Sequence, residues 1–131
     1  MPQTLIDILL DKNVDWAERD DAATYLIDYD EPEVEEALFS VASDINEDDD
    51  IAESCGECIA EIWCRNDLLS IDKIKKLKPA ALQEAVGIID ARKPEWMQTL
   101  KREGLTGARY GEFRFNLNIT DKPESEEKLT D

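Results

Sequence analysis

The chain has 131 residues and no histidine. Without an imidazole it has no Ser-His-Asp triad, no Cys-His pair and no histidine metal ligand. Basic residues are scarce as well: 15 Lys and Arg stand against 32 Asp and Glu, which gives a formal charge of −17. A strongly acidic surface repels nucleic acid and anionic membranes, so we expect neither as a partner and expect a basic molecule instead.

The shortage of basic residues is confined to the first half of the chain. Residues 1–64 hold 20 acidic and 2 basic side chains, whereas residues 65–131 hold 12 acidic and 13 basic ones. Asymmetry of this kind is typical of an interaction surface. The alternative interpretation is an acidic region whose charge serves only to keep the chain soluble.

Long apolar runs are also missing. No stretch approaches the roughly 20 apolar residues that a membrane-spanning helix needs. Residues 1–10 lack the basic start and the apolar core of a signal peptide, so we expect a cytoplasmic protein. Three cysteines within one predicted helix, Cys55, Cys58 and Cys64, do not make a disulfide framework.

Apolar residues recur with a helical period from about residue 4 to residue 102. Asn13 or Asp15 can cap the second helix, and prolines suit the first turns of three later ones. Gly104 is predicted to end the last helix. The prolines are Pro32, Pro79 and Pro94, and the third helix is predicted to bury Val34, Leu38, Val41, Ala42 and Ile45.

The predicted helices come in pairs, and the sequence repeats with them. Arg19-x-x-Ala22-Ala23-x-x-Leu26 aligns with Ala52-x-x-Cys55-Gly56-x-x-Ile59 at an offset of 33 residues. Leu82-x-x-Ala85-Val86-x-x-Ile89 follows after a further 30. Small residues recur where paired helices approach each other, and periods of this size indicate stacked helix pairs that share one core.

Together with Asp30-Glu31-Pro32-Glu33-Val34 and Leu38, the first repeat resembles a HEAT repeat of the short, lyase-associated kind. The resemblance covers residues 15–103, about three helix pairs, although Ala52 and Leu82 stand where the first repeat has the family's typical arginine. It implies an all-α fold, a short α-solenoid that binds a partner along one face. It also implies no catalytic residues and no cofactor, so we expect a non-enzymatic helical domain over residues 1–106.

Residues 107–120 carry a different pattern. Phe113, Phe115, Leu117 and Ile119 alternate with polar residues, which predicts an extended or β segment. Three pairings stay open: with the residues around 107–111, along the solenoid, or with the sheet of a partner. Residues 121–131 are charged and poor in apolar residues, so we expect a disordered acidic tail.

Two motifs invite a chemical interpretation. Cys55 and Cys58 have the C-x-x-C spacing, but they lie inside a predicted helix with no strand before it, which favours core packing over a metal or redox role. Residues 46–50, Asn-Glu-Asp-Asp-Asp, lack the ligand spacing of a calcium loop. We predict a solvated, helix-capping loop or a contact surface there, and no metal site.

The sharper hypothesis concerns carboxylates on the third predicted helix and on the loops at its two ends. In a solenoid successive loops stack on shared edges, so we expect a continuous negative patch with Tyr29 as its most exposed aromatic residue. Core packing is the alternative for Phe39 and Trp63. The predicted partner-binding residues are Asp28, Tyr29, Asp30, Glu31, Glu35, Glu36, Asp44, Glu47, Asp48, Asp49 and Asp50.

In its small size, its segregated acidity and its lack of catalytic groups, the chain resembles the immunity proteins of contact-dependent growth inhibition and similar polymorphic toxin systems. That resemblance implies a heterodimer with a basic toxin domain. A nuclease is the expected toxin, because it must be basic to hold its phosphate substrate. An acidic inhibitor reaches such a partner quickly by electrostatic steering. Two alternatives stay open, a HEAT-like scaffold or adaptor for another partner and a DNA mimic.

Overall fold

The computed structural model describes residues 2–106, and every regular element in that range is a helix. The prediction of an all-α fold is therefore confirmed for these residues, whereas the predicted segments 107–120 and 121–131 lie outside them. The chain divides into two compact units, residues 1–94 and 95–131. The elements are α1 (Pro2–Leu10), α2 (Trp16–Leu26), α3 (Pro32–Ala42), α4 (Asp49–Asn66), α5 (Ile71–Lys76), α6 (Pro79–Arg92), the 3₁₀ turn η1 (Pro94–Trp96) and α7 (Met97–Arg102).

Local signals set where the helices begin. Asp15 accepts a hydrogen bond from the Ala17 amide at 3.2 Å and so caps α2, as predicted. Asp48 caps α4 in the same way, through the Asp50 amide at 2.8 Å. Prolines open α3 and α6, where the missing N–H group has no helical partner to lose.

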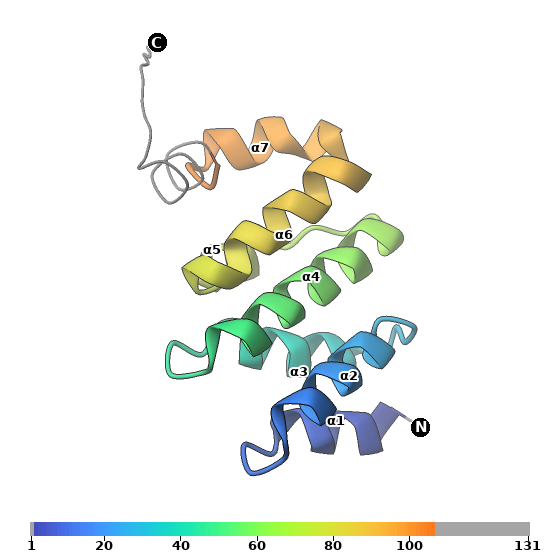
Figure 1. The fold of residues 1–131 in the computed structure, drawn as a ribbon. Coiled ribbons are helices and arrows are strands. Elements are labelled where there is room, and N and C mark those ends of the chain that lie inside the picture. Colours follow the sequence, from blue (N-terminus) through green and yellow to red (C-terminus); the bar gives the residue numbers. More distant parts are fainter. Residues whose placement is uncertain (1, 107–131) are drawn as a thin grey trace. The chain divides into compact units, whose positions relative to one another are not determined.

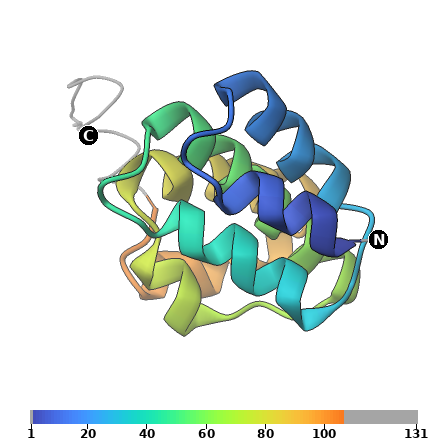
Figure 2. The same cartoon turned by 90° about the horizontal axis from the view of Figure 1, so that it is seen from below.

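The first unit consists of two layers of helices (Figures 1 and 2). Helix α4 packs against α2 on one side and α6 on the other, so α2, α4 and α6 form one layer. Helices α1 and α3 contact each other and lie, with α5, in the second layer. The connections α1–α2, α3–α4 and α5–α6 share the left edge of Figure 1, and the α2–α3 connection lies at the opposite edge.

The core lies between the two layers. Its largest fully buried side chains include Leu9, Leu26, Leu38, Ile51 and Ile59. Trp63 is buried and Phe39 is half-buried, in keeping with core packing. The prediction that Ile45 points inward is wrong, because α3 ends at Ala42 and the side chain of Ile45, in the following loop, is 79% exposed.

Helices α4 and α6 approach each other closely at Gly56. A Cβ atom on Gly56 would lie 2.5 Å from the carbonyl oxygen of Ala81. The close approach at this small residue of the repeat therefore lies between the second helices of successive pairs, α4 and α6.

In the second unit, Gly104 ends α7 as predicted. Its φ of +74° is the left-handed conformation that glycine adopts without strain. The Gly104 amide donates to the Lys101 carbonyl at 3.0 Å and the Leu105 amide to the Leu100 carbonyl at 2.9 Å, which is the Schellman pattern. Pro94 opens a 3₁₀ turn, and the α-helix itself begins at Met97.

Candidate protein-binding surface

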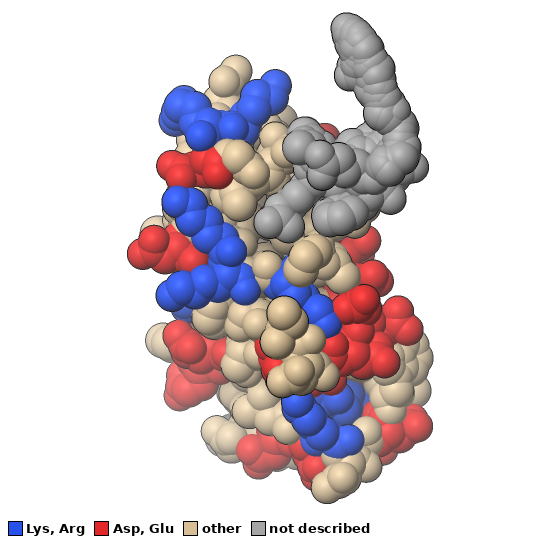
Figure 3. Space-filling model, turned by 90° about the vertical axis from the view of Figure 1, so that its left-hand side faces the viewer, with Lys and Arg blue, Asp and Glu red and all other residues tan. Residues whose placement is uncertain are grey.

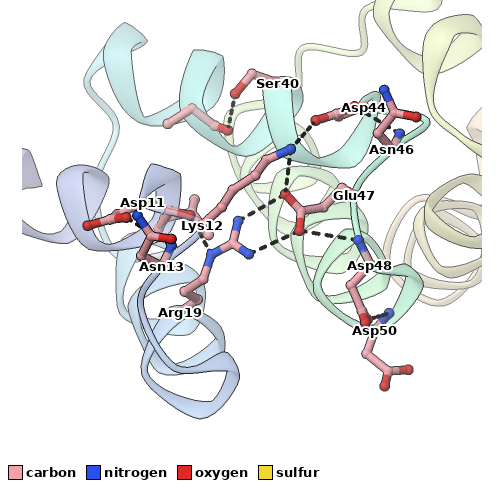
Figure 4. A network of polar contacts seen from close by, with 12 residues as sticks. Asp11, Lys12, Asn13, Arg19, Ser40, Asp44, Asn46, Glu47, Asp48 and Asp50 are labelled. Atoms are coloured by element: carbon pink, nitrogen blue, oxygen red, sulfur yellow. Dashed lines mark hydrogen bonds and ion pairs between the residues drawn. The ribbon is translucent and has the colours of Figure 1, made fainter.

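Arg19, the first residue of the repeat motif, forms a buried ion pair with Glu47 (Figure 4). Its Nη1 and Nη2 donate to the two carboxylate oxygens of Glu47 at 3.0 Å each, and its Nε donates to the Leu9 carbonyl at 2.8 Å. The Glu47 side chain is 5% exposed. The hydrogen bonds from Arg19 hold the pKa of Glu47 below its ordinary value. Glu47, one of the predicted contact residues, is therefore buried, and its carboxylate is paired in the interior.

The acidic loop around Glu47 receives further cations from the neighbouring loops of the same edge. Lys12, between α1 and α2, donates to Asp44 at 2.9 Å, and this hydrogen bond lowers the pKa of Asp44. Lys78, between α5 and α6, lies 2.7 Å from a carboxylate oxygen of Asp49 and donates to the Glu47 carbonyl at 2.5 Å. At this edge the α1–α2 and α5–α6 loops thus supply lysines that pair with carboxylates at and beside the α3–α4 loop.

Three carboxylates of α3 and of its first loop are paired as well. Arg65, near the end of α4, donates to Asp30 at 2.5 Å. Lys73 of α5 donates to Glu35 and Glu36, at 3.2 Å in each case. Cations from α4 and α5 therefore offset part of the negative charge of this surface.

These contacts reduce the negative charge of the predicted patch. The two ends of α3 lie at opposite edges of the unit, about 16 Å apart for an eleven-residue helix. Tyr29 is half-buried, whereas Tyr25 is 62% exposed. Six of the ten predicted carboxylates form ion pairs: Asp30, Glu35, Glu36, Asp44, Glu47 and Asp49.

A different set of carboxylates has no cation among the described residues. On the solvent side of α4, Glu53 and Glu57 follow each other at four-residue spacing. Asp20 flanks them from α2, where it accepts a hydrogen bond from Ser54, and Glu84 flanks them from α6. We call Asp20, Glu53, Glu57 and Glu84 the uncompensated cluster.

Two members of this cluster, Glu53 and Glu57, have raised pKa values. Burial raises the pKa of Glu53, and the charges of Glu84 and Asp50 raise it further. Burial also raises the pKa of Glu57, and Glu84 adds to that shift both by its charge and by a hydrogen bond between the two side chains. In Figure 3 acidic side chains gather at the right of the view, and others lie along the left edge and at the bottom, next to Lys and Arg.

An exposed aromatic residue belongs to the same layer of helices. Trp16 is 50% exposed and lies four residues before Asp20 on α2, so the two side chains share one side of that helix. Tryptophan with charged neighbours is typical of the residues that dominate binding energy at interfaces. The acidic spacing on α4 was readable from the sequence, but the contributions of α2 and α6 depend on tertiary packing.

The three cysteines are buried, and none of them forms a disulfide. Burial raises the pKa of Cys58 to about 12 and that of Cys55 well above its ordinary value of 9.0. Such thiols are poor nucleophiles, and the three side chains serve as core residues of α4. No group of three His, Cys, Asp or Glu side chains converges on a possible metal site within residues 2–106.

Comparisons with protein-family models, with curated proteins and with solved structures give no significant match to this chain. Over residues 2–106, no helix combines the length and the apolar character that crossing a bilayer requires.

Proposed function

We propose that this chain is a HEAT-like helical repeat module that binds a basic protein partner through the uncompensated cluster. The observation that carries the proposal is the contrast in charge pairing. The carboxylates of the predicted patch are largely paired with cations, whereas Asp20, Glu53, Glu57 and Glu84 lack one within residues 2–106.

This arrangement costs stability in the isolated chain. Like charges four residues apart on a helix destabilise it by about 0.2–0.5 kcal/mol per pair. Burial and mutual repulsion raise the pKa values of Glu53 and Glu57. Lys or Arg side chains of a partner would relieve that repulsion on binding, while Trp16 offers an apolar anchor beside them.

Several features support a solenoid architecture for the module. The sequence repeat coincides with α2, α4 and α6, which lie side by side in one layer. One small residue of the repeat, Gly56, stands at a close helix crossing, against the backbone of Ala81. Layers built from successive helix pairs leave one side of each helix open to a partner.

The most specific form of the proposal is an immunity protein in the cytoplasm. The partner is then a basic toxin, such as a nuclease, whose active site or substrate-binding face is covered in a heterodimer. Acidity supports this form, because complementary charge speeds association with a basic protein. The chain itself is not an enzyme under this proposal.

The test is a binding experiment with the purified product of the adjacent gene. We expect Glu53→Lys with Glu57→Lys to lower the association rate constant about tenfold at 50 mM salt, since steering depends on local charge. The matched control, Asp72→Lys with Asp90→Lys, makes the same change in net charge on α5 and α6 outside the cluster. Equal association rates for the two double variants would contradict the proposal.

A growth assay distinguishes the immunity-protein hypothesis from the adaptor hypothesis. We expect expression of the adjacent gene alone to stop growth, and co-expression of this chain to restore it. Binding without toxicity would instead favour the adaptor alternative, with the same cluster as its contact surface.

A further inference from the structure

Helix α1 carries more apolar surface than its neighbours cover. Five of its last six residues are Leu or Ile, at positions 5, 6, 8, 9 and 10. Packing against α2 and α3 buries Leu9 and Ile6, but Leu10 stays 45% exposed. A helix that is apolar over most of its circumference normally has neighbours on all of those sides. One side of α1 therefore lacks a neighbour within residues 2–106.

The uncovered side of α1 borders an open groove. Helices α1 and α3 lie side by side (Figure 2), and the space between them, about 530 Å³, is lined by apolar side chains that include Ile6, Leu10 and Ala37. A second space of about 270 Å³ continues it past Pro2, and the two share Ile6 and Glu33. The length of α1, about 13 Å, matches a guest helix of two to three turns.

The two walls of the groove differ in charge. The α1 wall is formed by Pro2, Gln3, Ile6 and Leu10, none of which is charged. The other wall carries Glu31, Glu33 and Glu36. Glu36 pairs with Lys73, whereas Glu31 and Glu33 have no cation among the described residues.

We propose that the α1–α3 groove binds a short amphipathic helix of a partner protein, with an apolar stripe in the groove and Lys or Arg along the edge that faces α3. Charge complementarity selects this occupant. A second copy of the chain fits less well, because its own apolar helix, residues 2–10, contains no Lys or Arg. The surface belongs to the α1–α3 layer and is distinct from the uncompensated cluster on α2, α4 and α6.

The test uses the full chain and a fluorescein-labelled peptide of 12 residues. Its leucines follow the i, i+3, i+7 spacing, and its lysines lie along one flank of that stripe. Two controls replace the lysines by Glu or scramble the order of the residues. We expect only the amphipathic lysine peptide to bind when binding is measured by fluorescence anisotropy. In NMR spectra of the protein, we expect that peptide to shift the backbone amide signals of α1 and α3.

Two substitutions of exposed groove residues sharpen the test. We expect Leu10→Gln and Glu33→Lys each to weaken peptide binding about fivefold to tenfold, for the lost apolar contact and the lost charge pair. The controls Leu68→Gln and Glu18→Lys make the same changes at exposed positions outside the groove and should leave the affinity unchanged.

Three results would overturn the inference. One is the absence of binding by the lysine peptide, and another is a map confined to α2, α4 and α6, which would assign the affinity to the uncompensated cluster. The third is tighter peptide binding after Arg109→Glu with Arg114→Glu, which would make the chain's own C-terminal residues the occupant. A failed search for a toxin partner would leave the groove result intact.

Discussion

Glu47 and Glu57 are ten residues apart in the sequence, and the fold shifts the pKa values of their carboxylates in opposite directions. Glu47 is buried and receives two hydrogen bonds from Arg19, which lower its pKa. Glu57 lies on the open side of α4 next to Glu84, and its pKa is raised. The fold thus pairs part of the charge at its loop edges with cations, whereas the cluster on the α2–α4–α6 layer has none among the described residues. Departures from local stability of this kind are expected at functional surfaces.

The largest effect on stability should come from breaking the buried ion pair between Arg19 and Glu47. Glu47→Gln leaves the guanidinium of Arg19 buried without a counter-charge, so we expect a loss of about 3–5 kcal/mol in the free energy of unfolding at pH 7. Urea denaturation measures it. The control Glu36→Gln removes a carboxylate from an exposed pair with Lys73, where about 0.2–1 kcal/mol is expected.

The pH dependence of the same variant follows from the sign of the pKa shift. A lowered pKa in the folded chain means that the carboxylate of Glu47 stabilises the fold above its ordinary pKa of 4.5, and that this contribution fades as the pH falls through the folded value. The wild type and Glu47→Gln should therefore converge in stability in acid. A constant difference from pH 7 down to acid would show that Arg19 does not depend on the charge of Glu47.

The second effect concerns the helix crossing that brings Glu57 near Glu84. Gly56→Ala would place a Cβ atom 2.5 Å from the backbone carbonyl of Ala81, so α4 and α6 must separate. We expect a net loss of about 1–3 kcal/mol, although alanine is the better helix former by about 1 kcal/mol. Calorimetry measures it.

A second substitution tests the cause of this loss. Because the clash involves a backbone oxygen, adding Ala81→Gly should not rescue Gly56→Ala. Recovery of stability in the double variant would place the strain in the Ala81 side chain instead.

Much of the fold was predictable because its signals are local. Asp15, Pro32 and Pro79 mark helix starts, and Gly104 marks the end of α7, through contacts within a few residues. The prediction that Ile45 is buried is wrong, because the apolar period continues past Ala42 although the helix ends there.

The site was predictable only in part, since its decisive contacts are distant in sequence. The first half of the chain holds the acidic excess, but the second half supplies the cations that neutralise it: Arg65 binds Asp30, and Lys73 binds Glu35. Charge separated along the chain is thus paired in part in space. Which carboxylates stay without a cation, Glu53 and Glu57 among them, depends on which helices pack together.

The smallest effect on stability is expected at Glu57, a carboxylate without a cation among the described residues. A raised pKa in the folded chain means that ionised Glu57 destabilises the fold, a cost that is absent below pH 4.5 and appears as the pH rises through the folded value. Glu57→Gln should therefore stabilise the chain at pH 7, by only about 0.2–0.5 kcal/mol because solvent screens an exposed group. The gain should shrink in acid and in 1 M salt, where charges interact over only about 3 Å. Urea denaturation over both series measures it. A loss of stability at pH 7 would mean that this carboxylate already has a favourable partner within the chain, and the proposed basic partner would lose its physical basis.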